Sequence, residues 1–352
     1  MTLRVVQWAT GNVGRAAAEA IVSHPDLELT GAWVHSKDKV GHDVGELCGL
    51  GTLGVTATNA IDQVIALAPD CVLYAPLLPN QQEVTKLLEA GINVVTPLNW
   101  FYPGKRDVSA LTSACEKGSA TLHGTGIHPG GITERFPLTI AAMSRAITHV
   151  RAEEFSDIRS YGAVDVIRNI MLFGKTPQEA KMSPMLILLT EGFSQSIEMI
   201  ADALGVALDP AIRSTHEVSV ATAPIDSPIG PIEPGQVAAQ RFTWEGLVQG
   251  EPVITARTNW FMGEQNLDPP WNFGPEGERF EVEVTGDPSI KTTFHGLHPE
   301  SIAAGLERNP GIVATAVHCV SAIPYVCRAE PGIKTYLDLP LVTGRADSRL
   351  RA

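Results

Sequence analysis

The order of hydrophobic and polar positions changes once along the chain, at about residue 132. Before that point, short apolar runs alternate with segments that have the spacing of amphipathic helices, which predicts a parallel sheet with helical crossovers. The expected strands begin at Val5, cover Leu27–Val34 and Cys71–Ala75, begin again at Val94 and end with Ala120–His123. Ligands of such sheets bind beyond the carboxyl ends of the strands, so these five ends should surround one crevice.

After residue 132 the pattern is that of antiparallel strands, in which apolar and polar residues alternate. Gln249-Gly250-Glu251 separates two of these runs and predicts a hairpin turn. Strands are expected at Ile147–Phe155, Ser214–Thr222, Ala238–Gln249, Pro252–Phe261 and Arg279–Thr285, and a mainly helical stretch over Thr176–Leu204. The pattern is helical again from Pro299, and the helix over Ile312–Ile323 is expected to return to the first sheet.

The predicted fold is therefore α/β with two domains. Residues 1–131, completed by 300–352, form a parallel-sheet domain. Residues 132–299 form an α+β domain with a large, mainly antiparallel sheet. The exposed face of so large a sheet usually needs a cover, and pairing with a second copy of the chain is a common solution.

A glycine turn joins the first strand to the first helix. Its residues are Ala9, Thr10, Gly11, Asn12, Val13 and Gly14. A strand, a tight glycine turn and a helix together bring main-chain N–H groups against a pyrophosphate, as in Rossmann-type dinucleotide domains. The first glycine of the usual pattern is replaced by Ala9, so the turn alone is weak evidence and an ordinary buried strand and turn is the alternative. Its position at the head of an alternating pattern favours dinucleotide binding.

The end of the second strand bears on the choice of dinucleotide. It is followed by His35, Ser36 and Lys37, and no carboxylate occurs before Asp38. A carboxylate at this place would bind the ribose of NAD, whereas a hydroxyl and a cation suit the 2′-phosphate of NADP. We therefore expect NADP(H) rather than NAD(H), with Asp38 reaching back to the ribose as the alternative. Ala75, Pro76 and Thr96, at the next strand ends, are further expected cofactor contacts.

Composition restricts the partners. The formal net charge is −13, with 44% hydrophobic and 18% charged residues among 352. Such a charge disfavours nucleic acid and anionic membranes, so we expect small-molecule substrates and a second copy of the chain as partners. The five cysteines are odd in number and show no C-x-x-C pair, which is typical of reduced thiols in a cytoplasmic protein. No apolar run is long enough to predict a membrane span.

Several longer segments resemble a known family. These are Gly45–Leu50, Gly124–Gly130 (GTGIHPG), Ile197–Gly205 (IEMIADALG), Ala322–Pro324 and Asp338–Pro340. Together with the glycine turn they resemble the 2,4-diaminopentanoate dehydrogenases and native amine dehydrogenases, relatives of dihydrodipicolinate reductase. The resemblance covers nearly the whole chain. It implies an NAD(P)-dependent homodimer that transfers hydride between nicotinamide and an imine carbon, interconverting a primary amine with a ketone and ammonia.

The chain departs from this family at one functional position. After the strand that contains Val94, family members with amine dehydrogenase activity carry a glutamate that handles the proton of ammonium. In this sequence that place falls on or next to Asn99. An amide can orient a substrate but cannot act as a general base. Either another residue, such as His128, Tyr102, Asp157 or Glu154, does the proton work, or the reaction is carbonyl or imine reduction without ammonia.

The candidate catalytic residues are therefore Asn99, His128 and Tyr102. His128 could donate a proton from a loop beside the expected nicotinamide, or it could be a structural histidine bonded to loop backbone. Trp100, Asp157 and Tyr161 are expected to line the substrate pocket, although Asp157 and Tyr161 could equally form a solvated face. His295 and His298 lack clustered acidic or thiol partners, so no metal site is expected. The predicted function is an NAD(P)H-dependent oxidoreductase, and a catalytically inactive dinucleotide sensor is the alternative from another class.

Overall fold

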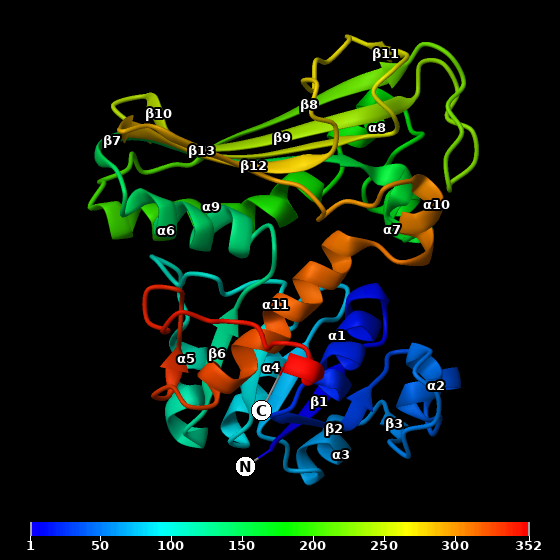
Figure 1. Cartoon of the computed structure of the whole chain (residues 1–352), viewed down its shortest axis with the longest axis vertical. Helices are drawn as coiled ribbons and strands as arrows, with labels where there is room; N and C mark the ends of the chain where they lie inside the picture. Colours follow the sequence, from blue (N-terminus) through cyan, green and yellow to red (C-terminus); the bar gives the residue numbers. More distant parts are fainter. Residues whose placement is uncertain (1, 351–352) are drawn as a thin grey trace. The chain divides into compact units, whose positions relative to one another are not determined.

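The structure is a computed structural model, and it describes residues 2–350 of the chain. It divides into two compact units, drawn in Figure 1. The first comprises Met1–Gly131 and Ile312–Ala352, and the second comprises Ile132–Gly311. Each unit contains one seven-stranded sheet. The α/β class predicted from the sequence, with one parallel and one mainly antiparallel sheet, is confirmed.

The sheet of the first unit is parallel throughout. Its strand order is β14-β6-β5-β4-β1-β2-β3. The strands are β1 Leu3–Trp8, β2 Leu27–Trp33, β3 Ala57–Thr58, β4 Cys71–Tyr74, β5 Asn93–Thr96, β6 Thr121–Gly124 and β14 Gly332–Ile333. Because the chain runs outward from β1 in one direction and then resumes at β4 on its other side, the order reverses between β1 and β4. Dinucleotides bind at such a reversal.

Helices cover both faces of this parallel sheet. They are α1 Asn12–Ser23, α2 Val44–Cys48, α3 Ile61–Ala66, α4 Gln81–Glu89, α5 Ser109–Gly118 and α11 Pro310–Val326. One apolar core joins α1 and α11 to the sheet, and a second joins α4 and α5 to its other face. Ala316, Cys319 and Ile323 of α11 are fully buried in the first core. The expected return of the last helix to the first sheet is thus confirmed.

The second unit is built on a mixed sheet with the order β11-β8-β9-β10-β7-β12-β13. Its strands are β7 Arg145–Asp157, β8 Arg213–Ala221, β9 Val237–Val248, β10 Glu251–Phe261, β11 Leu267–Asp268, β12 Arg279–Asp287 and β13 Ile290–Phe294. All pairs are antiparallel except β7 with β10. The β9–β10 turn is the predicted hairpin, and Gln249 and Gly250 both have the positive φ that a tight two-residue turn needs.

The helices of the second unit are α6 Phe136–Ala141, α7 Val164–Asn169, α8 Pro177–Lys181, α9 Met185–Leu204 and α10 Ile302–Glu307. In Figure 1, α6 and α9 lie along one face of the sheet. The helical stretch predicted over 176–204 is two helices, because Pro184 stands at the start of α9. The assignment of residues 300–311 to the first domain is wrong. Helix α10 packs within the second unit, where a Cβ on Gly305 would meet the Ser160 side chain at 2.6 Å.

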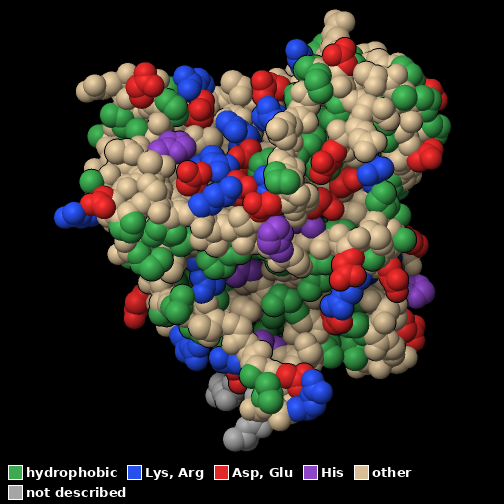
Figure 2. All heavy atoms as spheres, turned by 45° about the horizontal axis from the view of Figure 1, so that its top comes forward, with side chains coloured by type: hydrophobic (Ala, Val, Ile, Leu, Met, Phe, Trp, Pro, Cys, Tyr) green, Lys and Arg blue, Asp and Glu red, His purple; other side chains and the backbone are tan. Residues whose placement is uncertain are grey.

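The two faces of this mixed sheet differ in chemistry. On the face that α9 covers, Trp244 stacks on Phe193 of α9 with ring centroids 4.1 Å apart, and its Nε1 donates to Thr190 Oγ1 at 2.8 Å. The opposite face carries Arg and Glu side chains at alternate positions of β7, β9, β10 and β12. Figure 2 shows side chains of both charges gathered there.

Candidate dinucleotide site and the groups around it

The predicted turn between β1 and α1 has the geometry of a dinucleotide cradle. Helix α1 starts at Asn12 with Gly11 as its N-cap residue and has no acidic residue in its first turn. Ala9 adopts φ +72°, the left-handed conformation for which glycine is usual at this position. A Cβ on Gly14 would come within 2.9 Å of the Ala9 carbonyl carbon and closer still to its oxygen. Only glycine therefore allows α1 to approach β1 so closely.

The fully buried side chain of Gln7 stabilises the turn between β1 and α1. Its Nε2 donates to the carbonyl oxygens of Trp8 and Ala9 at 3.0 and 3.1 Å. These bonds fix the turn while the N–H groups at the start of α1 have no partner within the helix. The first turn of the helix thus offers its N–H groups and the positive end of its dipole to an anion.

Main-chain hydrogen bonds join the strand ends at which some of the other expected cofactor residues lie. Main-chain hydrogen bonds run from Ala9 N to Trp33 O at 2.8 Å and from Ala75 N to Trp8 O at 3.2 Å. The ends of β1, β2 and β4 are therefore adjacent, with Ala75 beside the glycine turn. At the next strands, Thr125 N donates to Thr96 O at 2.8 Å.

A basic side chain that the sequence analysis missed lies beside the turn. Ser36 is the N-cap residue of a short 3₁₀ helix, Lys37–Lys39, that follows β2. Lys39 Nζ donates to Thr10 Oγ1 at 3.3 Å, so its charge sits next to the glycine turn. The 3₁₀ turn carries Lys39 back toward Thr10, and spacing along the sequence alone gives no sign of that.

The loop after β5 holds three of the predicted active-site residues. Asn99 Oδ1 accepts a hydrogen bond from Trp100 N at 2.8 Å, and Trp100 has φ +58°. Trp100 is 7% exposed and belongs to the apolar core of this unit. Tyr102 is partly exposed. The loop lies against β6, since a Cβ on Gly124 would come within 2.6 Å of Phe101 N.

The loop after β6 is held by two residues that sequence reasoning did not single out. His318 Nδ1 pairs with Gly126 O at 2.5 Å, and its Nε2 lies 3.4 Å from Tyr336 OH. Tyr336 OH in turn bonds Thr125 Oγ1. His128, in the same loop, is partly exposed. An imidazole and a phenol thus stand at the end of β6, brought there from positions about 190 and 210 residues later in the chain, respectively.

In the second unit the predicted pocket residues Asp157 and Tyr161 have different surroundings. Asp157 forms a bidentate ion pair with Arg159, with N–O distances of 2.5 to 3.0 Å. Tyr161 lies near Glu154, and burial together with the Glu154 charge raises the pKa of its phenol. Glu154 Oε1 accepts from Ser156 Oγ at 2.6 Å, and Ser156 Oγ lies 2.8 Å from His298 Nε2.

Comparison with known proteins places these features in a family. Residues 132–350 match the model of the 2,4-diaminopentanoate dehydrogenase C-terminal domain, and residues 5–93 match that of the dihydrodipicolinate reductase N-terminus. An amine dehydrogenase of Streptomyces virginiae is 31% identical over 96% of both chains. The chain belongs to the amine dehydrogenase and 2,4-diaminopentanoate dehydrogenase family. The resemblance found in the sequence is thereby confirmed.

Further relatives agree with this assignment. The 2,4-diaminopentanoate dehydrogenase of Acetoanaerobium sticklandii is 24% identical over 96% of this chain and 94% of its own. The structure of the amine dehydrogenase from Mycobacterium smegmatis superposes with a TM-score of 0.79 at 21% identity, covering 98% of both chains. With family and cradle together, the protein is an NAD(P)-dependent oxidoreductase. Gly11, Asn12, Val13 and Gly14 form a turn that fits the diphosphate of such a cofactor.

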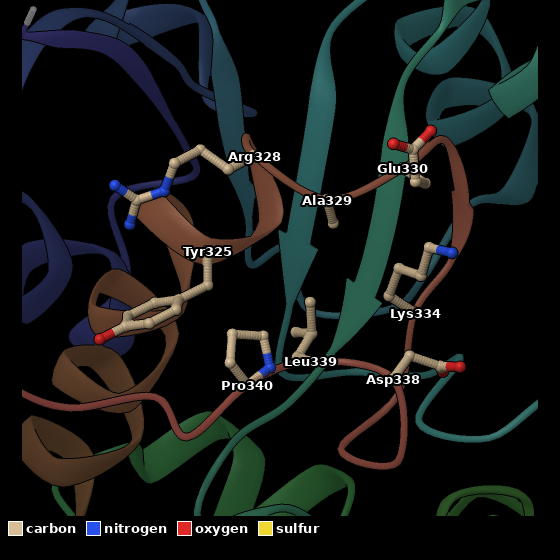
Figure 3. Close-up of a pocket in the computed structure, with 8 residues that line it drawn as sticks. All are labelled: Tyr325, Arg328, Ala329, Glu330, Lys334, Asp338, Leu339 and Pro340. Carbon is tan, nitrogen blue, oxygen red and sulfur yellow. The ribbon is translucent and has the colours of Figure 1, made fainter.

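A separate cavity of about 220 Å³ lies in the first unit (Figure 3). It is lined by Tyr325, Arg328, Ala329, Glu330, Lys334, Asp338, Leu339 and Pro340. None of the predicted site residues lines this cavity, and its walls carry both charges. Among residues 2–350, no helix has the length and apolar character needed to cross a membrane.

Proposed function

We propose that this oxidoreductase uses NADP(H) to interconvert a small, fairly apolar ketone or imine with the corresponding primary amine. The observation that carries the proposal is the family membership over 96% of the chain, because the matched relatives are named as dehydrogenases of amines. When bound, the nicotinamide supplies or accepts a hydride. The chain supplies the cradle at Gly11–Gly14, and the expected contacts His35, Ser36, Ala75, Pro76 and Thr96 at the neighbouring strand ends.

The preference for NADP(H) rests on the positive charges beside the turn. Lys39 bonds Thr10, Lys37 lies in the same 3₁₀ helix, and Ser36 caps that helix. We expect Lys39→Ala to weaken NADPH binding about tenfold, consistent with the loss of one charge-assisted contact of ~1.4 kcal/mol, and to leave NADH binding within twofold. Equal losses for both cofactors would contradict the preference. Asp38→Ala tests the alternative, in which that carboxylate binds the ribose of NAD and NADH binding alone suffers.

Turnover assays decide whether ammonia takes part in the reaction. Asn99 has no titrating group, and its Oδ1 is engaged with Trp100 N. We keep Asn99, Tyr102 and His128 as proposed contacts of the reacting carbon and nitrogen, and Trp100, Asp157 and Tyr161 as proposed pocket residues. The test follows NADPH and NADH absorbance with aldehydes, ketones and cyclic imines, each with and without ammonium. Ammonium-dependent oxidation is the expected result. Cofactor oxidation at a rate that does not depend on ammonium indicates a carbonyl or imine reductase. Cofactor binding without any turnover indicates a sensor.

We also propose that two copies pair through the charged face of the second sheet. On that face Arg151 bonds Glu153, Glu281 and Glu283, and Arg241 lies over the Trp271 ring at 4.5 Å. Light scattering should then give twice the mass of the chain. Arg241→Glu should shift the equilibrium toward monomer, whereas Lys117→Glu, an exposed residue of the first unit, should not. A monomeric parent protein at micromolar concentration would contradict the pairing. A cytoplasmic location, which fits the free cysteines, completes the proposal.

A further inference from the structure

The first residue after β1 is an alanine in the left-handed conformation. Ala9 has φ +72°, at the position where the usual dinucleotide turn has its first glycine. A side chain with a Cβ strains the backbone in this conformation, and such strain persists only where the surroundings hold it. The turn therefore needs a group that keeps Ala9 from relaxing to a negative φ.

One side chain holds the peptide planes on both sides of Ala9. Gln7 Nε2 donates to Trp8 O at 3.0 Å, in the plane before Ala9, and to Ala9 O at 3.1 Å, in the plane after it. Because peptide planes are rigid, rotation of the first plane sets φ of Ala9 and rotation of the second sets ψ. The first plane has a further support, since Ala75 N donates to Trp8 O at 3.2 Å. Within residues 2–350, the second plane has no hydrogen bond other than that from Gln7.

The orientation of the Ala9–Thr10 plane decides which of its groups faces an anion. The Ala9 carbonyl oxygen points into the contact between β1 and α1, where a Cβ on Gly14 would collide with it. In a trans peptide the following N–H points the opposite way, so the Thr10 N–H points out of that contact. A plane turned over would exchange the two groups and present a carbonyl oxygen to the diphosphate. Turns that bind phosphates present N–H groups instead.

Stability alone does not explain a glutamine at this place. Gln7 is 0% exposed, and within residues 2–350 its Oε1 has no hydrogen-bond partner. A buried polar atom without a partner destabilises the folded state, and an apolar side chain of similar length would avoid that loss. The orientation of the amide is fixed, because an oxygen in place of Nε2 would face two carbonyl oxygens. The two bonds that the NH2 group makes therefore account for the residue.

We propose that Gln7 is a positioning residue for the dinucleotide, which holds the Ala9–Thr10 peptide in the orientation that the diphosphate needs. Gln7 thereby allows an alanine to stand where glycine is usual. This assignment rests on the dinucleotide binding of the proposed function and not on its preference for NADP(H). Because the diphosphate is common to NADPH and NADH, Gln7 acts on both cofactors alike, whereas the positive charge of Lys39 acts on NADPH.

The test combines Gln7→Met with Ala9→Gly in a double-mutant cycle. Methionine is close to glutamine in length and has no donor. We expect Gln7→Met to raise Kd for NADPH and for NADH about tenfold, which corresponds to ~1.4 kcal/mol. Ala9→Gly alone should keep both Kd values within ~2-fold of the parent, because glycine adopts positive φ without support. The double variant should bind within ~3-fold of the parent, so that the two changes are not additive.

A second buried glutamine provides the matched control. Gln240 is 1% exposed, its Nε2 donates to Met171 O at 2.6 Å, and its Oε1 lies 3.0 Å from His216 Nε2. Gln240→Met removes the same kind of bond to a carbonyl oxygen, but in the second unit. It should lower Tm of the cofactor-free protein and leave both Kd values unchanged. Fluorescence titration gives Kd, and thermal melts followed by circular dichroism give Tm.

The outcomes separate this assignment from the proposed function. Parental Kd values in Gln7→Met overturn the assignment, and so does a loss of binding that Ala9→Gly does not restore. A loss confined to NADPH also overturns it, because the diphosphate is present in both cofactors. A parent protein that binds neither dinucleotide overturns the proposed function itself. If Gln7→Met does not fold, Gln7→Leu takes its place with the same expected results.

Discussion

Alanine substitutions at the two glycines of the turn, Gly11 and Gly14, should separate an effect on cofactor binding from an effect on folding stability. At Gly14 an added Cβ would lie 2.9 Å from the Ala9 carbonyl carbon, nearer to the Ala9 oxygen, and 3.2 Å from Gln7 Nε2. At Gly11 an added Cβ meets nothing within 4 Å, and the backbone has φ −75°, which alanine adopts freely. The two substitutions add the same methyl group three residues apart, one into a packed contact and one into open space.

The expected magnitudes follow from these contacts. Gly14→Ala forces α1 away from β1, and such overpacking costs ~1–3 kcal/mol, from which up to ~1 kcal/mol is recovered by the better helix propensity of alanine. A net loss of ~1–2 kcal/mol should lower Tm by roughly 2–8 °C for a unit of this size. Gly11→Ala should leave Tm within 1 °C of the parent protein, roughly the uncertainty of a near-neutral substitution. It should nevertheless weaken NADPH binding at least ~10-fold, since the methyl group occupies the path of the diphosphate.

Thermal melts followed by circular dichroism give Tm, and NADPH fluorescence titration gives Kd. Both are measured on the cofactor-free protein first, because bound cofactor would stabilise the folded state and mask the difference. An unchanged Tm for Gly14→Ala would show that the turn relaxes without cost. An unchanged Kd for Gly11→Ala would show that the diphosphate does not approach Gly11, and the cradle would then need another explanation.

Three further predictions concern the rest of the molecule. Burial opposes the ionisation of Glu281, but hydrogen bonds from Arg279, Arg151 and Lys291 lower its pKa to about 2. Its contribution to stability is therefore present above pH 4.5 and is lost as the pH falls toward 2. Glu281→Gln should make Tm less dependent on pH between 4.5 and 2, and an equal fall of Tm in both proteins would refute this. Gly124→Ala should displace the loop that carries Asn99 and reduce turnover at least ~10-fold with NADPH still bound, whereas Gly344→Ala, where a Cβ meets nothing within 4 Å, should match the parent in a steady-state assay. Thr176→Ala removes one half of the capping box of α8 and should cost ~0.5–2 kcal/mol in urea unfolding, and a midpoint identical to the parent would mean that this helix is held by other contacts.

The strands and turns that depend on a local pattern of residues could be predicted from the sequence. Apolar runs bounded by turns predicted β1, β2, β4 and β6 within a few residues, and the Gln249-Gly250 hairpin follows from residues that accept positive φ. The edge strand β13 was missed because its five residues alternate too briefly to stand out. Helix α10 was assigned to the wrong domain because helical spacing says nothing of the surface on which a helix packs.

The site was predicted less completely, because its groups come from distant parts of the chain. Tyr336 and His318 join the loop after β6 through contacts across about 190 to 210 residues, and no local signal marks them. Lys39 was missed because only the fold of its short helix brings it to Thr10. Glu154 was considered in the sequence as one of four possible proton carriers, with His128, Tyr102 and Asp157, and the choice among them stays a prediction.

The sheet of the second unit places two adjacent carboxylates in opposite electrostatic surroundings. Glu153 and Glu154 are adjacent on β7 and therefore point to opposite faces. On the charged face, Arg151, Arg257 and Asn259 surround Glu153, and the nearby Glu281 is paired with arginine so well that its pKa falls to about 2. On the covered face Glu154 has hydrogen bonds with Ser156 and Trp260, which lower its pKa, but burial outweighs them and raises the pKa to about 7. A single step along one strand thus separates a carboxylate that is paired with arginine from one whose pKa is raised by burial.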